Sequence, residues 1–125
     1  MSIKEMPIFT RTFDFLSWLV PATNNFPRSQ RFYATKRLLD AAFDLREYLE
    51  EANIRRGKQR MERLIRADEA LARVRIYLRL AVRWEWLNHG QYEHVSNMIV
   101  EIGKLLGGWK KVTEEPAGGS KLPAG

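Results

Sequence analysis

The chain has 125 residues and a mass of 14.7 kDa, which is the size of a single domain. Hydrophobic residues make up 45% and charged residues 29%, so the chain is a folded globular protein rather than a collagen-like, mucin-like or low-complexity one. Because the sequence contains no cysteine, disulfide scaffolds, thiolate metal sites and cysteine nucleophiles are excluded.

The positive charge is concentrated in the middle of the chain. The formal net charge is +6, and residues 55–83 carry ten basic and three acidic side chains, whereas residues 1–54 are neutral overall and residues 84–125 have a net charge of −1. Concentrated arginine is typical of proteins that bind a polyanion, since each basic side chain that docks on a phosphate releases condensed counterions. We therefore expect a nucleic-acid partner.

The amino-terminal segment predicts neither export nor membrane insertion. Glu5 and Pro7 stand where a signal peptide would begin its apolar run, and no stretch approaches the roughly 20 apolar residues of a membrane span. We expect a soluble, cytoplasmic protein without membrane contact.

Apolar residues recur at helical spacing, and no segment alternates as a strand does. The first predicted helix covers about residues 8–20, with Pro7 at a favourable entry position, and Pro21 either ends or kinks it. Apolar side chains surround it almost completely: Ile8, Phe9, Phe13, Phe15, Leu16, Trp18 and Leu19.

Ser29 is the predicted N-cap of a second helix that reaches about residue 54. Its expected core residues recur at intervals of three and four: Phe32, Thr35, Leu39, Ala42, Leu45, Leu49 and Ala52. Gly57 separates this helix from a third, predicted over about residues 58–87.

A turn at residues 88–90 precedes the fourth predicted helix, which begins near Gln91 and continues to about residue 112. A heptad seam runs along it: Tyr92, Val95, Ile99, Ile102, Leu106 and Trp109. Residues 113–125 hold five Gly and Pro and are expected to form a disordered tail. Long helices with short connections predict an all-α fold, an antiparallel up-down four-helix bundle over residues 1–112, with both termini at one end.

The third helix carries two apolar faces. One is an ordinary core stripe of Leu64, Ala67, Leu71, Val74, Leu78, Ala81 and Val82. The other contains Ile76, Tyr77, Leu80, Trp84 and Leu87, interrupted by Arg66 and Arg73. This second face indicates a partner surface, and we predict an oligomer interface at Ile76, Leu80, Trp84 and Leu87. The alternative is that the first helix of the same chain covers it.

Arg75, Arg79 and Arg83 form a row, each one helical turn beyond the last. Neighbouring like charges at this spacing repel by a few tenths of a kcal/mol. One interpretation is a stripe that tracks phosphates; the other is pairing with the acids of the second helix, Asp40, Asp44, Glu47 and Glu51. The predicted nucleic-acid contacts are Arg66, Arg73, Arg75, Arg79, Arg83, Lys104 and Lys111.

No catalytic, cofactor or metal constellation is recognisable in the sequence. A di-iron bundle needs inward Glu-x-x-His pairs, and Gln91 stands where the first carboxylate of such a pair would be. The two histidines, His89 and His94, point about 140° apart on a helix and cannot share a metal. We predict no catalytic residue, no cofactor and no metal, and therefore no enzyme.

Two segments carry a family resemblance. Residues 67–81 alternate arginine with aromatic or aliphatic side chains, and residues 102–109 read Ile-Gly-Lys-Leu-Leu-Gly-Gly-Trp. Both resemble the accessory variability determinant (Avd) family of diversity-generating retroelements, and a looser similarity extends over about residues 9–112, including Pro21.

The resemblance implies a four-helix bundle that assembles into a positively charged pentameric barrel. It further implies a non-catalytic subunit that binds a reverse transcriptase and nucleic acid and supports mutagenic retrohoming, in which a template RNA is copied into cDNA. Four-helix-bundle proteins encoded in ribosomal RNA intervening sequences are the near alternative, acting as a protein-only adaptor or structural oligomer.

Overall fold

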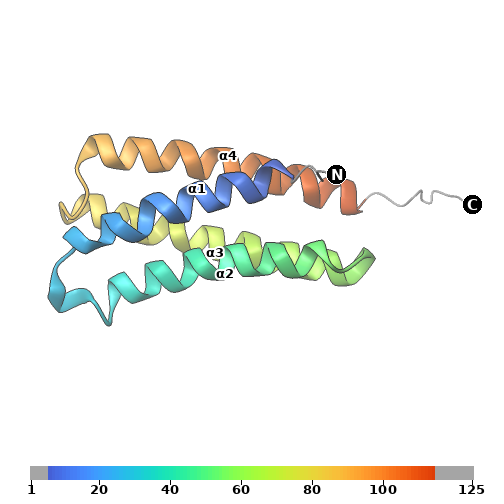
Figure 1. Ribbon diagram of the computed structural model, residues 1–125, viewed down its shortest axis with the longest axis horizontal. Helices are drawn as coiled ribbons and strands as arrows, with labels where there is room; N and C mark the ends of the chain where they lie inside the picture. The colour runs from blue at the N-terminus through green and yellow to red at the C-terminus, as the bar shows by residue number, and fades with distance from the viewer. Residues whose placement is uncertain (1–5, 115–125) are drawn as a thin grey trace, which may run out of the picture.

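The structure, a computed structural model, describes residues 6–114 and consists of helices joined by short connections (Figure 1). The α-helices are α1 (Pro7–Ala22), α2 (Ala34–Asn53), α3 (Gly57–Arg83) and α4 (His89–Glu114). Two 3-10 turns, η1 (Thr23–Asn25) and η2 (Arg28–Gln30), lie between α1 and α2. No strand occurs within the described range, so the all-α prediction is confirmed.

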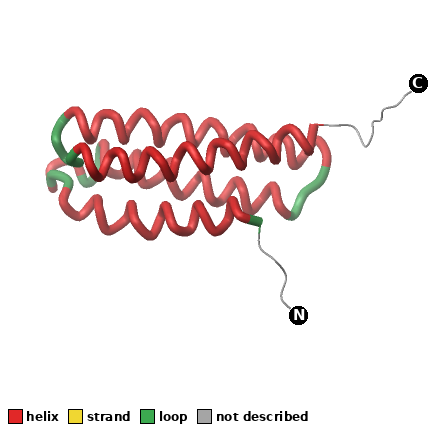
Figure 2. Tube along the Cα trace, turned by 90° about the horizontal axis from the view of Figure 1, so that it is seen from above, coloured by secondary structure: helices red, strands yellow, loops and turns green. Residues whose placement is uncertain are grey.

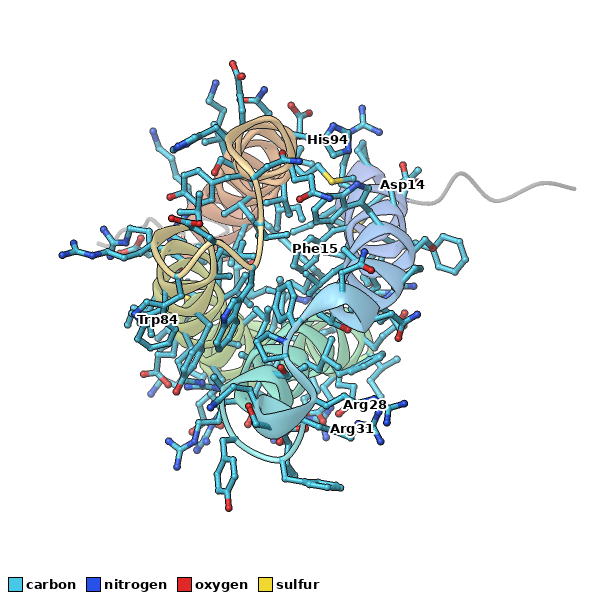
Figure 3. The ribbon with its side chains drawn as sticks, turned by 90° about the vertical axis from the view of Figure 1, so that its left-hand side faces the viewer. Asp14, Phe15, Arg28, Arg31, Trp84 and His94 are labelled. Carbon is cyan, nitrogen blue, oxygen red and sulfur yellow. The ribbon has the colours of Figure 1, made fainter. Side chains whose placement is uncertain are left out.

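The helix axes lie roughly horizontally in Figure 1, and successive helices run in opposite directions, so the bundle is antiparallel. The view from above shows the same side-by-side alignment of the axes (Figure 2). α1 packs against α2 and α4, and α3 packs against the same two helices. The start of α1 and the end of α4 lie at one end of the bundle, and the α1–α2 and α3–α4 connections lie at the other. α1 and α3 are therefore diagonally opposed, as the end-on view also shows (Figure 3).

The core follows the predicted apolar stripes closely. In α3 the buried residues are Leu64, Ala67, Ala70, Leu71, Val74, Leu78 and Ala81, and in α4 they are Val95, Ile99, Ile102, Leu106 and Trp109. Phe15 and Leu19 of α1 are completely buried, whereas Phe13 on the same helix stays exposed. The apolar ring of α1 is thus only partly used by the bundle.

The second helix begins later than predicted. α2 starts at Ala34, and Ser29 lies in η2, so Ser29 is not its N-cap. The reason is Pro27, which holds Phe26 in an extended conformation, after which the chain makes a short 3-10 turn before α2 begins. As a result Phe32 lies outside the helix and is exposed instead of belonging to the core.

The first helix passes through Pro21 and ends one residue later, at Ala22. Proline has no N–H to donate to the Ser17 carbonyl, and its ring crowds that carbonyl, so the helix does not continue far beyond it. Pro7 occupies the first turn, as predicted.

The end of the third helix also differs from the prediction. α3 stops at Arg83, and the residue in the left-handed conformation is Glu85, with φ of 64°, not a residue of the expected turn at 88–90. The backbone N–H of Trp86 donates to the Ala81 carbonyl at 2.8 Å, and that of Glu85 donates to Val82 at 3.1 Å. These two bonds are the Schellman pattern of a helix end.

Asn88 caps the fourth helix, and Gly90 lies inside its first turn. The Asn88 Oδ1 accepts a hydrogen bond from the Gln91 backbone N–H at 2.7 Å, and Gln91 Oε1 accepts one from the Asn88 N–H at 2.9 Å. This reciprocal capping box fixes the start of α4. α4 extends to Glu114, so residues 113–114 are helical, and the rest of the predicted tail lies outside the described residues.

We predict that Glu85→Gly stabilises the protein. Glycine removes the strain of the left-handed conformation, which costs a non-glycine residue about 1–2 kcal/mol. It also loses more backbone entropy on folding, which costs roughly 0.5–1 kcal/mol, so the net stabilisation is about 0.5–1 kcal/mol. Thermal unfolding measures it against Glu85→Ala, which removes the same carboxylate but keeps the strain. Equal melting temperatures for the two variants would contradict this account.

Candidate nucleic-acid interface

Several arginines of this basic chain serve the fold. Arg46 of α2 donates hydrogen bonds to the Phe9 carbonyl at 2.9 Å and to Thr12 Oγ1 at 3.2 Å, and its guanidinium lies 5.1 Å from the centre of the Phe9 ring. Arg60 of α3 donates to the Ala52 carbonyl at the end of α2 and lies 5.6 Å from the Trp109 ring. These contacts join α2 to α1, and α3 to α2 and α4.

Two arginines on the flank of α3 that faces α2 are paired with carboxylates. Arg63 Nε is 2.8 Å from Glu51 Oε1, and Arg73 reaches Asp44 of α2 at 3.6 Å. Arg66 lies seven residues before Arg73 and therefore on the same side of α3; it is exposed. Arg66 and Arg73 accordingly belong to the α2 flank of the helix.

The predicted arginine row lies on the other flank, which faces α4. A Cβ atom placed on Gly103 of α4 would lie 2.8 Å from an Arg75 guanidinium nitrogen, so the Arg75 side chain rests directly against α4 at that glycine. Arg75 and Arg79 line a groove of about 230 Å³ between the two helices, together with Tyr92 and Ser96. Arg83 continues the row one turn further and is exposed.

The row is free of ion pairs. Across residues 6–114, no carboxylate lies within ion-pair distance of Arg75, Arg79 or Arg83. The acids of α2 are engaged elsewhere or point away, since Asp40 pairs with Lys36 at 2.6 Å, Asp44 with Arg73 and Glu51 with Arg63. The interpretation that α2 neutralises the row is therefore wrong, because α2 lies on the opposite flank of α3.

The predicted contacts thus fall on two surfaces instead of one. Lys104 follows Gly103 on α4 and is exposed, and Lys111, seven residues later, shares its outer face. Together with the row they form a basic α3–α4 surface of Arg75, Arg79, Arg83, Lys104 and Lys111. Lys110 is not part of this surface, because its Nζ pairs with Asp68 Oδ2 of α3 at 2.9 Å.

The second apolar face of α3 is present but smaller than predicted. Ile76 and Trp84 are about half exposed, and Leu80 is half-buried. Leu87 is 2% exposed, so its assignment to a partner surface is wrong: α3 ends before it, and the following loop turns its side chain into the core. α1 does not cover this face, because α1 packs on α2 and α4.

Sequence reasoning missed one exposed apolar residue that extends this surface. Ile65, eleven residues before Ile76, lies on the same outer side of α3. Ile65 could have been found from its helical spacing with Ile76. The apolar strip then consists of Ile65, Ile76, Leu80 and Trp84, and it separates the α2 flank from the α4 flank.

One of the two histidines, His94, packs against an aromatic ring of a neighbouring helix. His94 of α4 lies 5.4 Å from the Trp18 ring of α1, measured between ring centres, and Figure 3 shows His94 between these helices. Among the described residues, no three acidic or histidine side chains are grouped so that they could hold a metal. None of the helices in that part of the chain combines the length and apolar character that crossing a membrane requires.

The fold and the unpaired arginine row define a class, a four-helix bundle with a basic groove between its last two helices. Residues 6–113 match the family model described as bAvd-like, and the chain belongs to that family, which confirms the resemblance to Avd. No curated protein matches the chain.

A solved structure gives the same fold. It is a protein with unknown function from the S23 ribosomal protein family of Bacteroides thetaiotaomicron, 23% identical, with a TM-score of 0.75. The similarity covers 83% of this chain and 98% of that one. The four-helix arrangement is therefore shared with an experimentally determined protein.

We predict that the row contributes nothing to stability. Replacing Arg75, Arg79 and Arg83 together by alanine removes no ion pair and relieves like-charge repulsion, so each substitution should change the free energy of unfolding by less than about 0.5 kcal/mol. Arg46→Ala is the control, since it removes three hydrogen bonds, one of them in an ion pair with Glu50, and a cation–π contact, and should cost about 2 kcal/mol. Chemical denaturation measures both. A triple variant as unstable as Arg46→Ala would contradict the assignment.

Proposed function

We propose that this protein is a non-catalytic accessory subunit of a diversity-generating retroelement, one that binds the reverse transcriptase together with template RNA or its cDNA and supports mutagenic retrohoming. Membership of the bAvd-like family supports the system. The observation that carries the nucleic-acid part of the proposal is the unpaired arginine row beside the α3–α4 groove.

The row is suited to a phosphate backbone. Its guanidinium groups each offer several donors in a planar fork, and neighbouring arginines lie one helical turn apart, about 5.4 Å along the axis. Arg75 lies against Gly103, and Arg75 and Arg79 share the groove with Tyr92 and Ser96. None of these neighbours supplies a negative charge. Backbone phosphates position a ligand without reading its bases, so binding should be largely independent of sequence.

Assembly would multiply this surface. We propose a homo-oligomer formed through the apolar strip of α3, with five subunits as the family resemblance implies. Each subunit repeats the +7 charge of residues 55–83, and several copies on one particle raise the effective concentration of template near a bound polymerase.

A protein-only adaptor is the competing function. The exposed apolar strip of α3 favours it, because such a strip binds protein surfaces without nucleic acid. The two functions differ in their use of the arginine row: a protein-only adaptor has no need of three unpaired arginines, whereas a nucleic-acid subunit depends on them.

Reconstituted cDNA synthesis tests the proposed function. A cognate reverse transcriptase and its template RNA should give cDNA only when this protein is added, and the Arg75, Arg79 and Arg83 triple alanine variant should fail to support synthesis. Arg66→Ala, which removes one charge from the other flank, is the control. Equal cDNA yield with and without the protein would overturn the accessory function, and full support by the triple variant would overturn its electrostatic basis.

Light scattering tests the assembly. The wild-type protein at micromolar concentration should have a mass several times 14.7 kDa. Ile76→Asp should shift it toward the monomer, because a carboxylate at the centre of a packed interface is buried without a partner. Phe13→Asp, on the opposite helix, serves as the control. A wild-type monomer would refute this interface.

A further inference from the structure

A pocket separate from the α3–α4 groove lies where the α1–α2 connection meets the start of α2. Its volume is about 420 Å³, and its polar lining comes from Thr23, Asn24, Arg28, Arg31 and Thr35. Figure 3 shows Arg28 and Arg31 projecting from the lower right of the bundle end, whereas Trp84 of the α3 end lies to the left. The pocket is therefore on the far side of α2 from the arginine row.

Thr35 in this pocket has an unused hydroxyl group. The residue is 8% exposed, and its Oγ1 has no hydrogen-bond partner. Thr12, the other buried threonine in the described part of the chain, is fully engaged: its Oγ1 donates to the Ile8 carbonyl at 2.9 Å and accepts from Arg46. The Oγ1 atom has less than 1 Å² of accessible surface, so this hydroxyl is enclosed behind the pocket wall and the ligand contacts of the pocket must come from other side chains.

Both charged side chains in the pocket lining are arginines. Residues 23–39 contain Arg28, Arg31, Lys36 and Arg37 and no acidic side chain. Lys36 is paired with Asp40, but neither pocket arginine has an ion-pair partner between residues 6 and 114. Two unpaired guanidinium groups in one pocket lining are complementary to a tetrahedral oxyanion, whose oxygens accept hydrogen bonds from both.

Two strongly exposed aromatic residues follow the pocket directly. Phe32 is 74% exposed and Tyr33 is 67% exposed, and they are the two residues after Arg31 in the sequence. Basic side chains beside exposed aromatic rings are the arrangement with which proteins hold single-stranded nucleic acid, because bases stack on the rings while the phosphates meet the charges. This pairing favours a nucleic-acid strand over an acidic peptide.

The pocket wall is also held in place by the rest of the bundle. Phe26, which lines it, is buried and lies 5.4 Å from the Trp86 ring of the α3–α4 connection, and Trp86 in turn contacts Trp84 at 5.2 Å. The two connections at this end therefore support each other. A prepared wall lowers the ordering cost of binding.

We propose that this pocket binds one backbone phosphate of a single-stranded nucleic acid, held by Arg28 and Arg31, with adjoining bases stacked on Phe32 and Tyr33. The inference rests on the proposed function, since it assigns the same ligand class to a second surface of the bundle. It gives the strand a second anchor, on the opposite flank from the arginine row.

The test measures the affinity of a short single-stranded RNA for the full chain. Arg28→Ala with Arg31→Ala should weaken binding about tenfold or more. It should also lower the slope of log K against log salt by about 0.7, the value for one phosphate of a single strand. Arg37→Ala, which removes an exposed charge outside the pocket, is the control and should have a much smaller effect.

Thr35→Val is a second control, for the shape of the pocket. It removes the enclosed hydroxyl at constant shape, so the free protein should melt at a higher temperature and bind RNA as tightly as the wild type. Phe32→Ala with Tyr33→Ala should weaken RNA binding but leave the salt slope unchanged, because stacking neutralises no phosphate.

The outcomes separate this proposal from the proposed function. RNA binding that depends on the α3 row but not on Arg28 or Arg31 overturns the pocket alone. Absence of RNA binding by the wild-type protein overturns both. An acidic peptide of equal charge that binds as tightly, with the same sensitivity to the pocket variants, overturns the nucleic-acid assignment.

Discussion

Two guanidinium groups of α3 that turn toward α2, those of Arg63 and Arg73, meet carboxylates, and those that turn toward α4 meet none. Glu51 and Asp44 of α2 take up Arg63 and Arg73, whereas the facing side of α4 presents Tyr92, Ser96 and Gly103. The α4 acid in an ion pair, Glu101, pairs with Arg11 of α1 on its other side. One helix thus has a flank on which two arginines are paired with its neighbour and a flank whose arginine row is open to an outside anion. The proposed nucleic-acid surface is a consequence of where the neighbouring helices carry their acids.

Close packing around α3 makes this division possible. Alanines fill much of the α2–α3 contact, including the fully buried Ala42 and Ala52 of α2 and Ala67 and Ala70 of α3, so the two helices approach closely and arginines at the edge of α3 reach α2. On the α4 side, Gly103 leaves room for the Arg75 guanidinium to lie against the helix. A glycine inside a helix costs about 1 kcal/mol relative to alanine, and an alanine here would push that guanidinium outward. The small residues at the α2–α3 and α3–α4 contacts therefore determine which groups the arginine side chains of α3 can reach.

The spacing of apolar residues predicted the parts of the fold that depend on burial. It failed at helix ends, whose positions depend on the backbone conformation of single residues. The seam from Val95 to Trp109 was found because each of its residues is buried at helical spacing. The start of α2 and the end of α3 were missed, since Pro27 delays one helix and the left-handed Glu85, a residue with no preference for that conformation, ends the other. The row was predicted from spacing, but its freedom from ion pairs could not be, because pairing depends on which neighbour each flank of α3 faces. Nothing in the local sequence indicates that the Thr35 hydroxyl is left unpaired.

The dependence of RNA affinity on salt tests the central claim most directly. Single-stranded RNA bound by the wild-type protein should give a linear fall of log K with log salt, and the Arg75, Arg79 and Arg83 triple alanine variant should lose about 0.7 of slope for each phosphate released. The loss should be nearly the same for RNAs of unrelated sequence, since backbone phosphates carry no base information. Equal slopes for the wild-type protein and the triple variant would show that the unpaired flank of α3 does not contact phosphate, and would contradict the account.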